Sequence, residues 1–392
     1  MASLISTIKN LAIIEMARGI SFFSRKRCDK KIWIISETQN QYQDSGYELY
    51  QWLKKNKPDI DAYYVLDKNN RTNAVFLNDE KMLWHETLKL TYYLFIADRI
   101  LSTHGLWMIP NGLGIQKKCL IEKFKHKGVM LHHGIMYLKN CEQFYHKDKF
   151  SLTGLMIATS QREKNLYIDQ YGYDNKEIVV TGLPRHDSLV NESNNSPWPN
   201  LIVFMPTFRE NEQNIGENFK TTEMFNRIST LVNDNEIKKL FVENNIHLAI
   251  YLHQNIQNQS EYLFELESEH VHVVKQGDYG VKELLVYGKI LITDYSSTIF
   301  DFAYMSKACI LYPFDFETYL PSRSSKSIKD IRQDIPADVV VEHSELVGAI
   351  KKLVFSDYKV TTDKINKIKH FFEHNDLNNC ERVYEEILKM KI

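Results

Sequence analysis

The chain has 392 residues, of which 43% are hydrophobic, and its 49 basic and 50 acidic residues give a formal net charge of −1. At about 100–200 residues per domain, this length predicts two domains with enough apolar residues for a core in each. A balanced charge provides no global field that would draw the chain onto a nucleic acid, so we expect no such partner. Five scattered cysteines without a C-x-x-C pair indicate neither a zinc site nor a disulfide framework, and the expected compartment is the cytoplasm.

Residues 1–30 predict an amphipathic helix. Lys9, Glu15 and Arg18 interrupt any signal-peptide core, and no apolar run is long enough to span a bilayer. The apolar face could lie on a membrane surface, or it could dock on the protein's own body. The sequence slightly favours docking, because only three basic residues cluster nearby, at positions 25–27. The apolar residues that recur at helical spacing are Ile5, Ile8, Ala12, Met16, Ile20 and Phe23.

Short apolar runs then alternate with longer, helix-compatible stretches, which is typical of a parallel sheet flanked by helices. A polar segment with two prolines at 191–199 interrupts this alternation and marks a domain boundary. We therefore predict an α/β protein with two Rossmann-like domains, 31–190 and 191–355, whose parallel sheets face a central cleft, and helices at 356–392 that pack back across it. The predicted strands lie at 32–35, 62–66, 99–101, 128–131, 155–158 and 178–180, and then at 201–204, 248–251, 271–274, 290–292 and 309–312.

Ligands of open α/β sheets bind at the carboxyl ends of strands, so polar residues that directly follow the apolar runs are candidate site residues. In the first half, His133 follows a strand and precedes Gly134, an arrangement that suits a general base beside a close backbone approach. A pair of surface or structurally bonded histidines is the alternative. Arg185, His186 and Asp187 follow another strand and a Gly-Leu-Pro turn, where they could position an acceptor or hold the domains together.

In the second half, Thr207 and Arg209 follow a strand and offer a hydroxyl and a planar fork that suit phosphate oxygens. His253 follows the next strand and could donate to a phosphate, although a hydrogen-bonded core histidine fits equally well.

The stretch 289–302 ends a buried strand in Thr, Asp, Ser, Ser and Thr before a helix begins, which predicts a phosphate site of amides and hydroxyls. Its alternative is a serine that only caps the helix. We expect Asp294 and Asp301 to orient neighbouring loops rather than to act as paired catalytic carboxylates. The predicted phosphate-binding residues of this stretch are Thr293, Ser296, Ser297 and Thr298.

These motifs resemble those of the CDP-glycerol glycerophosphotransferases, which build teichoic acids and similar capsules. The resemblance rests on residues 131–134, 180–187, 205–209, 252–253 and 292–302, and weaker similarity covers most of the chain. It implies a GT-B fold, peripheral membrane association at the inner face of the cell membrane, and CDP-glycerol as donor without a tightly bound cofactor. Family members often have Trp-His-Gly-Thr-Pro-Leu-Lys where this chain has residues 132–139, and Leu-His-Pro where it has 252–254, which leaves the acceptor open. Lys139 remains an acceptor candidate.

The implied reaction is the attack of an acceptor hydroxyl on the β-phosphorus of CDP-glycerol while His133 removes its proton and CMP leaves. Neutral His133 and charged His253 would give a bell-shaped pH dependence. No clear D-x-D metal motif is present, and the sequence leaves the requirement for a divalent metal open. A donor such as CDP-ribitol or a nucleotide sugar, a sugar-nucleotide epimerase and a non-catalytic polymer-binding protein remain alternatives. The oligomeric state, and whether one unit or many are added, are also open.

Overall fold

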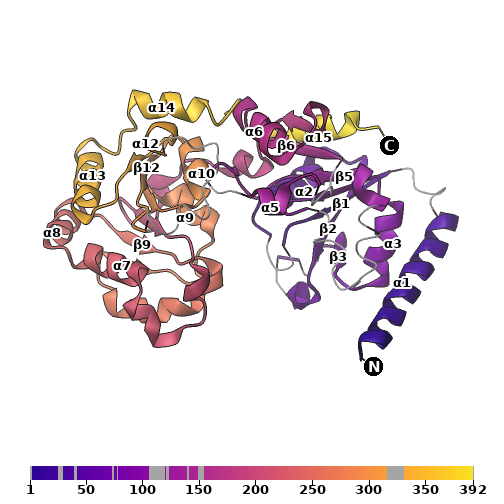
Figure 1. Ribbon diagram of the computed structural model, residues 1–392, viewed down its shortest axis with the longest axis horizontal. Helices are drawn as coiled ribbons and strands as arrows, with labels where there is room; N and C mark the ends of the chain where they lie inside the picture. The colour runs from indigo at the N-terminus through magenta and orange to yellow at the C-terminus, as the bar shows by residue number, and fades with distance from the viewer. Residues whose placement is uncertain are drawn as a thin grey trace. The chain divides into compact units, whose positions relative to one another are not determined.

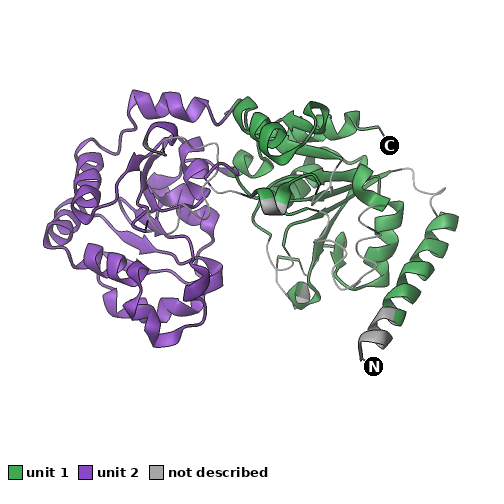
Figure 2. Ribbon diagram, in the orientation of Figure 1, with its two compact units in different colours: residues 1–135, 142–188, 373–392 green, residues 136–141, 189–372 purple. Residues whose placement is uncertain are grey.

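The computed structural model describes residues 2–24, 30–38, 42–72, 75–76, 78–105, 120, 123–138, 141–148, 154–315 and 331–391. The chain divides into two compact units, shown in Figure 2. Unit 1 comprises Met1–Ile135, Glu142–Ser188 and Glu373–Ile392, and unit 2 comprises Met136–Cys141 and Leu189–Phe372. The main division after Ser188 lies close to the predicted boundary, whereas the predicted C-terminal segment 356–392 is shared between the units.

Unit 1 is built on a seven-stranded sheet in the order β3-β2-β1-β4-β5-β6-β7, in which every neighbouring pair is parallel (Figure 1). Trp33 and Ile35 face one apolar cluster, and Ile32 and Ile34 face the other, so both faces of the sheet are buried. The strands are β1 (Lys31–Ser36), β2 (Ile60–Leu66), β3 (Met82–Trp84), β4 (Arg99–Ser102), β5 (Gly128–Met130), β6 (Leu155–Ala158) and β7 (Ile178–Val180). The α-helices are α1 (Ala2–Ser24), α2 (Ser45–Asn56), α3 (Leu88–Ile96), α5 (Glu142–Tyr145), α6 (Gln161–Tyr171) and α15 (Asn379–Lys389).

Unit 2 is built on a six-stranded parallel sheet in the order β10-β9-β8-β11-β12-β13. The α/β prediction with two parallel sheets is therefore confirmed. The strands are β8 (Ile202–Met205), β9 (Leu248–Ile250), β10 (Val271–Val273), β11 (Ile290–Thr293), β12 (Ala308–Leu311) and β13 (Asp338–Val339). The α-helices are α7 (Glu223–Asn233), α8 (Asn235–Asn244), α9 (Val281–Tyr287), α10 (Thr298–Tyr304), α12 (Ile331–Asp334), α13 (His343–Phe355) and α14 (Thr362–Lys369).

Helix α1 docks on α3, but not through the apolar stripe that the sequence analysis singled out. Ile14 and Ala17 face inward and join the cluster that contains Leu90 and Leu94 of α3. The side chain of Ile5 lies outside the described residues, but from Ile8 onwards the predicted stripe remains exposed, with Ile8 at 59%, Met16 at 55%, Ile20 at 47% and Phe23 at 80%. The helix is therefore apolar on both faces, and only one of them is covered by described residues. No helix in the described part of the chain is long and apolar enough to cross a membrane.

The turn after β7 ties the C-terminal helix α15 to unit 1. Both carboxylate oxygens of Asp187 accept hydrogen bonds at the start of α15, at 2.8 Å from the Asn379 amide and 2.7 Å from the Cys380 amide. The guanidinium of Arg382 donates to the carbonyl of Thr181 at 2.9 Å. Gly182 adopts a φ of +79°, and a Cβ there would lie 1.9 Å from the side-chain oxygen of Asn379. This position therefore needs glycine for both conformation and space.

Gly182→Ala should destabilise unit 1 by about 2–4 kcal/mol, because it combines a left-handed backbone with a clash. Asn379 cannot easily move away, because its side chain is bonded to Asp187 and to Arg382. Gly348→Ala is the matched control, since a Cβ there meets nothing within 4 Å in the middle of α13. That control should gain about 0.5–1 kcal/mol. Urea unfolding measures both effects, and equal stability of the two variants would contradict the assigned role of Gly182.

Candidate active site

At the carboxyl edge of the unit 1 sheet, the chain turns sharply after β5. His132 lies in the left-handed region at φ +52°, and Gly134 follows at φ +152°. Such a conformation is strained for histidine and is typical of functional turns. The turn leaves His133 half-buried and stacked on His104, which follows β4, with ring centroids 4.3 Å apart. We call His104, His132 and His133 the histidine edge.

Arg185 connects the histidine edge to the start of α2. Its Nη1 donates to the carbonyl oxygen of His133 at 2.6 Å and lies 3.3 Å from Oδ1 of Asp44, the residue that caps α2. Burial lowers the pKa of His104 well below its usual range, and the nearby charges of His133, His132 and Arg185 lower it further. The His104 ring that stacks on His133 is therefore held in its neutral form at physiological pH.

His132 has a structural position within the histidine edge. It is 1% exposed, and its ring stacks on Tyr167 of α6 with centroids 5.0 Å apart. Burial, with a smaller contribution from His133, lowers its pKa from 6.5 to about 3. His132 is therefore neutral in the folded protein at physiological pH.

This burial predicts a loss of stability in acid. Between about pH 3 and 6.5, His132 binds a proton in the unfolded chain but not in the folded protein. Protonation therefore stabilises the unfolded chain, and the free energy of unfolding falls as the pH falls below 6.5. At about pH 5 the loss from this group should be about 2 kcal/mol. His132→Asn tolerates a left-handed backbone and does not titrate. Urea unfolding at about pH 7.5 and 5 should therefore show a smaller pH dependence for the variant, and an unchanged dependence would contradict this assignment.

At the carboxyl edge of the unit 2 sheet, Asp294 holds two strand ends together. Its Oδ1 accepts the backbone N–H of Thr207 at 2.8 Å and that of Tyr295 at 2.6 Å. Its Oδ2 lies 2.9 Å from Nη2 of Arg209, and the side chain is fully buried. Asp294 thus orients the loops after β8 and β11 at the same time. Thr293 adds to this link, because its hydroxyl donates to the carbonyl of Met205 at 2.6 Å.

The guanidinium group of Arg209 makes its hydrogen bonds within the protein and is not directed at an open site. It donates from Nε and Nη2 to the two carboxylate oxygens of Asp315 at 2.7 and 2.8 Å, and from Nη1 to the carbonyl of Thr207. Burial disfavours the charged guanidinium, but Asp294 and Asp315 more than offset this effect and raise the Arg209 pKa. These contacts fix Arg209 relative to Asp294 and Asp315. Direct contact with a phosphate, as the sequence analysis expected, would require Arg209 to change partners.

The predicted phosphate turn, Ser296, Ser297 and Thr298, leads into α10. Ser296 Oγ accepts from the backbone N–H and the hydroxyl of Thr298, at 3.3 and 3.0 Å. Ser297 is the N-cap residue, but its side chain makes no capping hydrogen bond. All three side chains are partly exposed. The turn therefore offers partly exposed hydroxyls that suit phosphate oxygens, whereas the N–H groups of Thr298, Ile299 and Phe300 already donate to Ser296 and Ser297.

His253 follows β9 and is also partly exposed. Its Nδ1 accepts the backbone N–H of Asn255 at 3.2 Å, and its ring packs on Phe208 with centroids 4.6 Å apart. Because a backbone N–H can only donate, Nδ1 must supply a lone pair, so the proton of the neutral ring is on Nε2. In this tautomer Nε2 can donate to a phosphate, and the charged form that the sequence analysis expects stays a prediction.

The remaining predicted site residues have different environments. His186 and Asp301 are buried, Asp187 is bonded to α15, and Lys139 lies outside the described residues. Sequence reasoning missed His104. This residue follows β4 and precedes Gly105, in the same way that His133 follows β5 and precedes Gly134. It also did not assign a role to Asp315, which lies four residues after the end of β12. Within the described ranges, no group of three His, Cys, Asp or Glu side chains is placed to hold a metal ion.

Comparison with known proteins places these observations in a family. The sequence profile of the family described as CDP-Glycerol:Poly(glycerophosphate) glycerophosphotransferase matches residues 20–389. The minor teichoic acid biosynthesis protein GgaB of Bacillus subtilis is 22% identical over 98% of this chain, but this chain covers only 42% of GgaB. The teichoic acid glycerol-phosphate primase of the same species is 23% identical over 84% of this chain and 81% of its own length. The teichoic acid poly(ribitol-phosphate) polymerase of Bacillus spizizenii is 25% identical over 87% of this chain and 53% of its own length.

Solved structures with a similar fold include the wall teichoic acid polymerase TagF, with a TM-score of 0.67 at 17% identity over 99% of this chain and 98% of that chain. A putative UDP-N-acetylglucosamine 2-epimerase from Listeria monocytogenes reaches a TM-score of 0.56 at 14% identity over 91% of this chain and 95% of that chain. At these identities the likeness concerns the fold alone.

Proposed function

Because the chain belongs to the CDP-glycerol:poly(glycerophosphate) glycerophosphotransferase family, we propose that it transfers glycerol phosphate from CDP-glycerol to a hydroxyl of a teichoic-acid-like or capsular acceptor. The family match over residues 20–389, which includes His133, His253 and the phosphate turn, carries this proposal. CMP is the second product. We propose a polyol-phosphate or saccharide chain as the acceptor, and the polyol-phosphates named in the relatives' descriptions support the first of these.

In the proposed reaction, an acceptor hydroxyl attacks the β-phosphorus of CDP-glycerol as His133 takes its proton. The new P–O bond forms while the bond between the β-phosphorus and the bridging oxygen breaks, and CMP leaves with the electron pair of that bond. Such transfers depend on in-line positioning and on stabilising charge on the phosphate oxygens. Ser296, Ser297 and Thr298 supply hydroxyls for this purpose, and His253 donates from Nε2.

Arg209, Asp294 and Thr293 have a supporting role in this proposal. Arg209 donates to Asp315, Asp294 accepts from the backbone of Thr207, and the Thr293 hydroxyl donates to the Met205 carbonyl. These bonds hold the loops after β8 and β11 in place. Thr207 differs from them, because its hydroxyl is buried and has no hydrogen-bond partner among the described residues. It is therefore available to a donor phosphate if the loop opens. On the acceptor side, Arg185 fixes the backbone of His133 through its carbonyl oxygen, and Gly134 allows close approach.

We also propose that the enzyme works at the inner face of the cell membrane. The exposed apolar stripe of α1 supports this proposal, since an amphipathic helix can lie in the membrane interface.

A transfer assay tests the proposed function. The full chain is incubated with CDP-glycerol and a short defined acceptor, and CMP release and product mass are followed. Parallel reactions contain CDP-ribitol or a UDP-sugar, because relatives include a poly(ribitol-phosphate) polymerase and epimerases share the fold. Turnover of CDP-glycerol alone among these donors supports the proposal. Turnover of the UDP-sugar without CDP-glycerol transfer would contradict it.

A further inference from the structure

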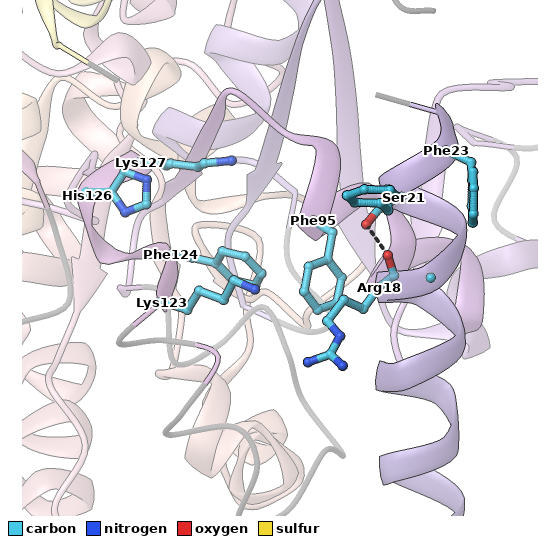
Figure 3. A pocket seen from close by; sticks show the side chains of 10 residues that line it. Arg18, Ser21, Phe23, Phe95, Lys123, Phe124, His126 and Lys127 are labelled. Carbon is cyan, nitrogen blue, oxygen red and sulfur yellow. Dashed lines mark hydrogen bonds between the residues drawn. The ribbon is translucent and has the colours of Figure 1, made fainter. Parts of the chain in front are cut away.

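Unit 1 contains a pocket of 790 Å³ between the C-terminal end of α1 and the segment at 123–127. Its apolar lining comes from four phenylalanines: Phe22, Phe23, Phe95 and Phe124. Figure 3 shows Phe95 and Phe124 between α1 and this segment, whereas Phe23 lies on the outer side of the helix. Phe22 and Phe23 are 79% and 80% exposed, so the apolar lining continues onto the surface.

The same pocket carries positive charge and, among its described lining residues, no acidic side chain. Nζ of Lys123 lies 4.9 Å above the centre of the Phe95 ring, so a cation is held directly over the apolar lining. Arg18 pairs with Glu15 at 2.7 Å, and both side chains are more than half exposed, so this pair is weak and easily exchanged. Lys127 is buried and donates to the carbonyl of Ala97. Burial lowers the pKa of His126, so Lys123 and Arg18 are the cations that can reach a ligand.

The pocket opens beside the exposed stripe of α1. Ile20 and Phe23 belong to the stripe, and Phe23 also lines the pocket. Gly19 directly precedes Ile20, lies about one helical turn before Phe23 and also lines the pocket, and a Cβ at this position would meet nothing within 4 Å. An apolar surface that leads into an apolar, basic pocket matches a molecule with a hydrocarbon chain and an anionic head.

We propose that this pocket binds one anionic phospholipid of the bilayer, with its phosphate on Lys123 and Arg18 and its acyl chain against Phe95 and Phe124. The proposal deepens the membrane attachment proposed above and rests on it, because the α1 stripe would bring the pocket to the lipid surface. A free anion would leave the phenylalanines exposed to water, and a purely apolar ligand would make no use of the charges of Lys123 and Arg18. Charge and apolar lining together favour a lipid.

Co-sedimentation of the full chain with vesicles tests the proposal. Vesicles of phosphatidylcholine are compared with vesicles of an equimolar mixture with phosphatidylglycerol. The wild-type chain should bind the mixed vesicles about tenfold more tightly or better, since each cation near an anionic surface contributes about fivefold. Lys123→Glu should weaken binding to the mixed vesicles by about tenfold or more. Lys239→Glu, an exposed position on α8 in unit 2, makes the same change in net charge and should stay within about twofold.

Substitutions at Gly19 separate the pocket from the surface stripe. Gly19→Trp should fill the pocket and weaken binding to the mixed vesicles by about tenfold, whereas Gly19→Ala should stay within about twofold. If only the stripe inserted, the added tryptophan would strengthen binding, because tryptophan favours the membrane interface. Stronger or unchanged binding by Gly19→Trp would therefore overturn the proposal.

Two further readouts complete the experiment. The first readout is the solution mass of Gly19→Trp. If this mass changes while the lipid affinity does not, the pocket binds a second copy of the chain, and the proposal is overturned. CMP release from CDP-glycerol is measured without vesicles, where all four variants should match wild type. Absence of transfer with lipid binding retained would defeat the proposed function alone. Transfer without selective lipid binding would defeat the lipid site alone.

Discussion

His133→Ala is expected to lower the rate of CMP release from CDP-glycerol by about 100-fold or more, because a general base usually contributes at least that much. The effect should appear in kcat, since the proton is taken as the hydroxyl attacks and not when the substrates bind. The stacked contact with His104 is lost, but His133 is only half-buried, so the fold should persist. Steady-state kinetics with a short acceptor measures the change.

The control for His133→Ala is His370→Ala, which removes an exposed histidine at the C-terminal end of α14 in unit 2. This control should retain turnover within about twofold of wild type. A His133→Ala enzyme that stays within about threefold of wild type would remove His133 as the base. Loss of the slope on the acidic side of the pH–rate profile is the second sign expected for a missing base.

Asp294→Ala is expected to have the largest effect on stability, a loss of about 3–5 kcal/mol in the free energy of unfolding. The change removes a fully buried carboxylate, leaves the backbone N–H groups of Thr207 and Tyr295 without their acceptor, and weakens the pairing of Arg209. Donor binding should weaken as well, because the loops after β8 and β11 lose their common anchor. Urea unfolding and the KM for CDP-glycerol measure the two consequences.

Asp294→Asn separates the contributions of hydrogen bonding and charge. Its side-chain oxygen can still accept from Thr207 and Tyr295, so about half of the stability loss or less should remain. Asp278→Ala provides the control at an exposed loop carboxylate and should change stability by about 0.5 kcal/mol or less. If Asp294→Ala were as stable as this control, Asp294 would not hold the two loops together.

The sequence predicted the parallel sheets well, because buried strands are continuous apolar runs and their ends are polar. It missed the short strands β3 and β13, which have three and two residues. It also identified the wrong inward face of α1. Periodicity can locate an apolar stripe, but it cannot tell which face is covered when both faces are apolar.

The candidate site was predictable as a set of positions and less so as a set of contacts. Strand ends placed Ser296, His253 and His133 at the carboxyl edges, which is a consequence of parallel topology. The partners of Arg209 could not be read from the sequence, because Asp315 is 106 residues away and becomes its neighbour only through the order of the strands. The same holds for Asp187, whose partner Cys380 is 193 residues further along the chain.

The central claim is that glycerol phosphate moves intact from CDP-glycerol to an acceptor hydroxyl. The most direct measurement is the ratio of CMP released to glycerol phosphate units gained by a defined acceptor, followed by mass spectrometry in one reaction. We predict one CMP for every unit gained, with both lost together in His133→Ala. CMP release without any gain in acceptor mass, or acceptor growth without CMP, would contradict the account.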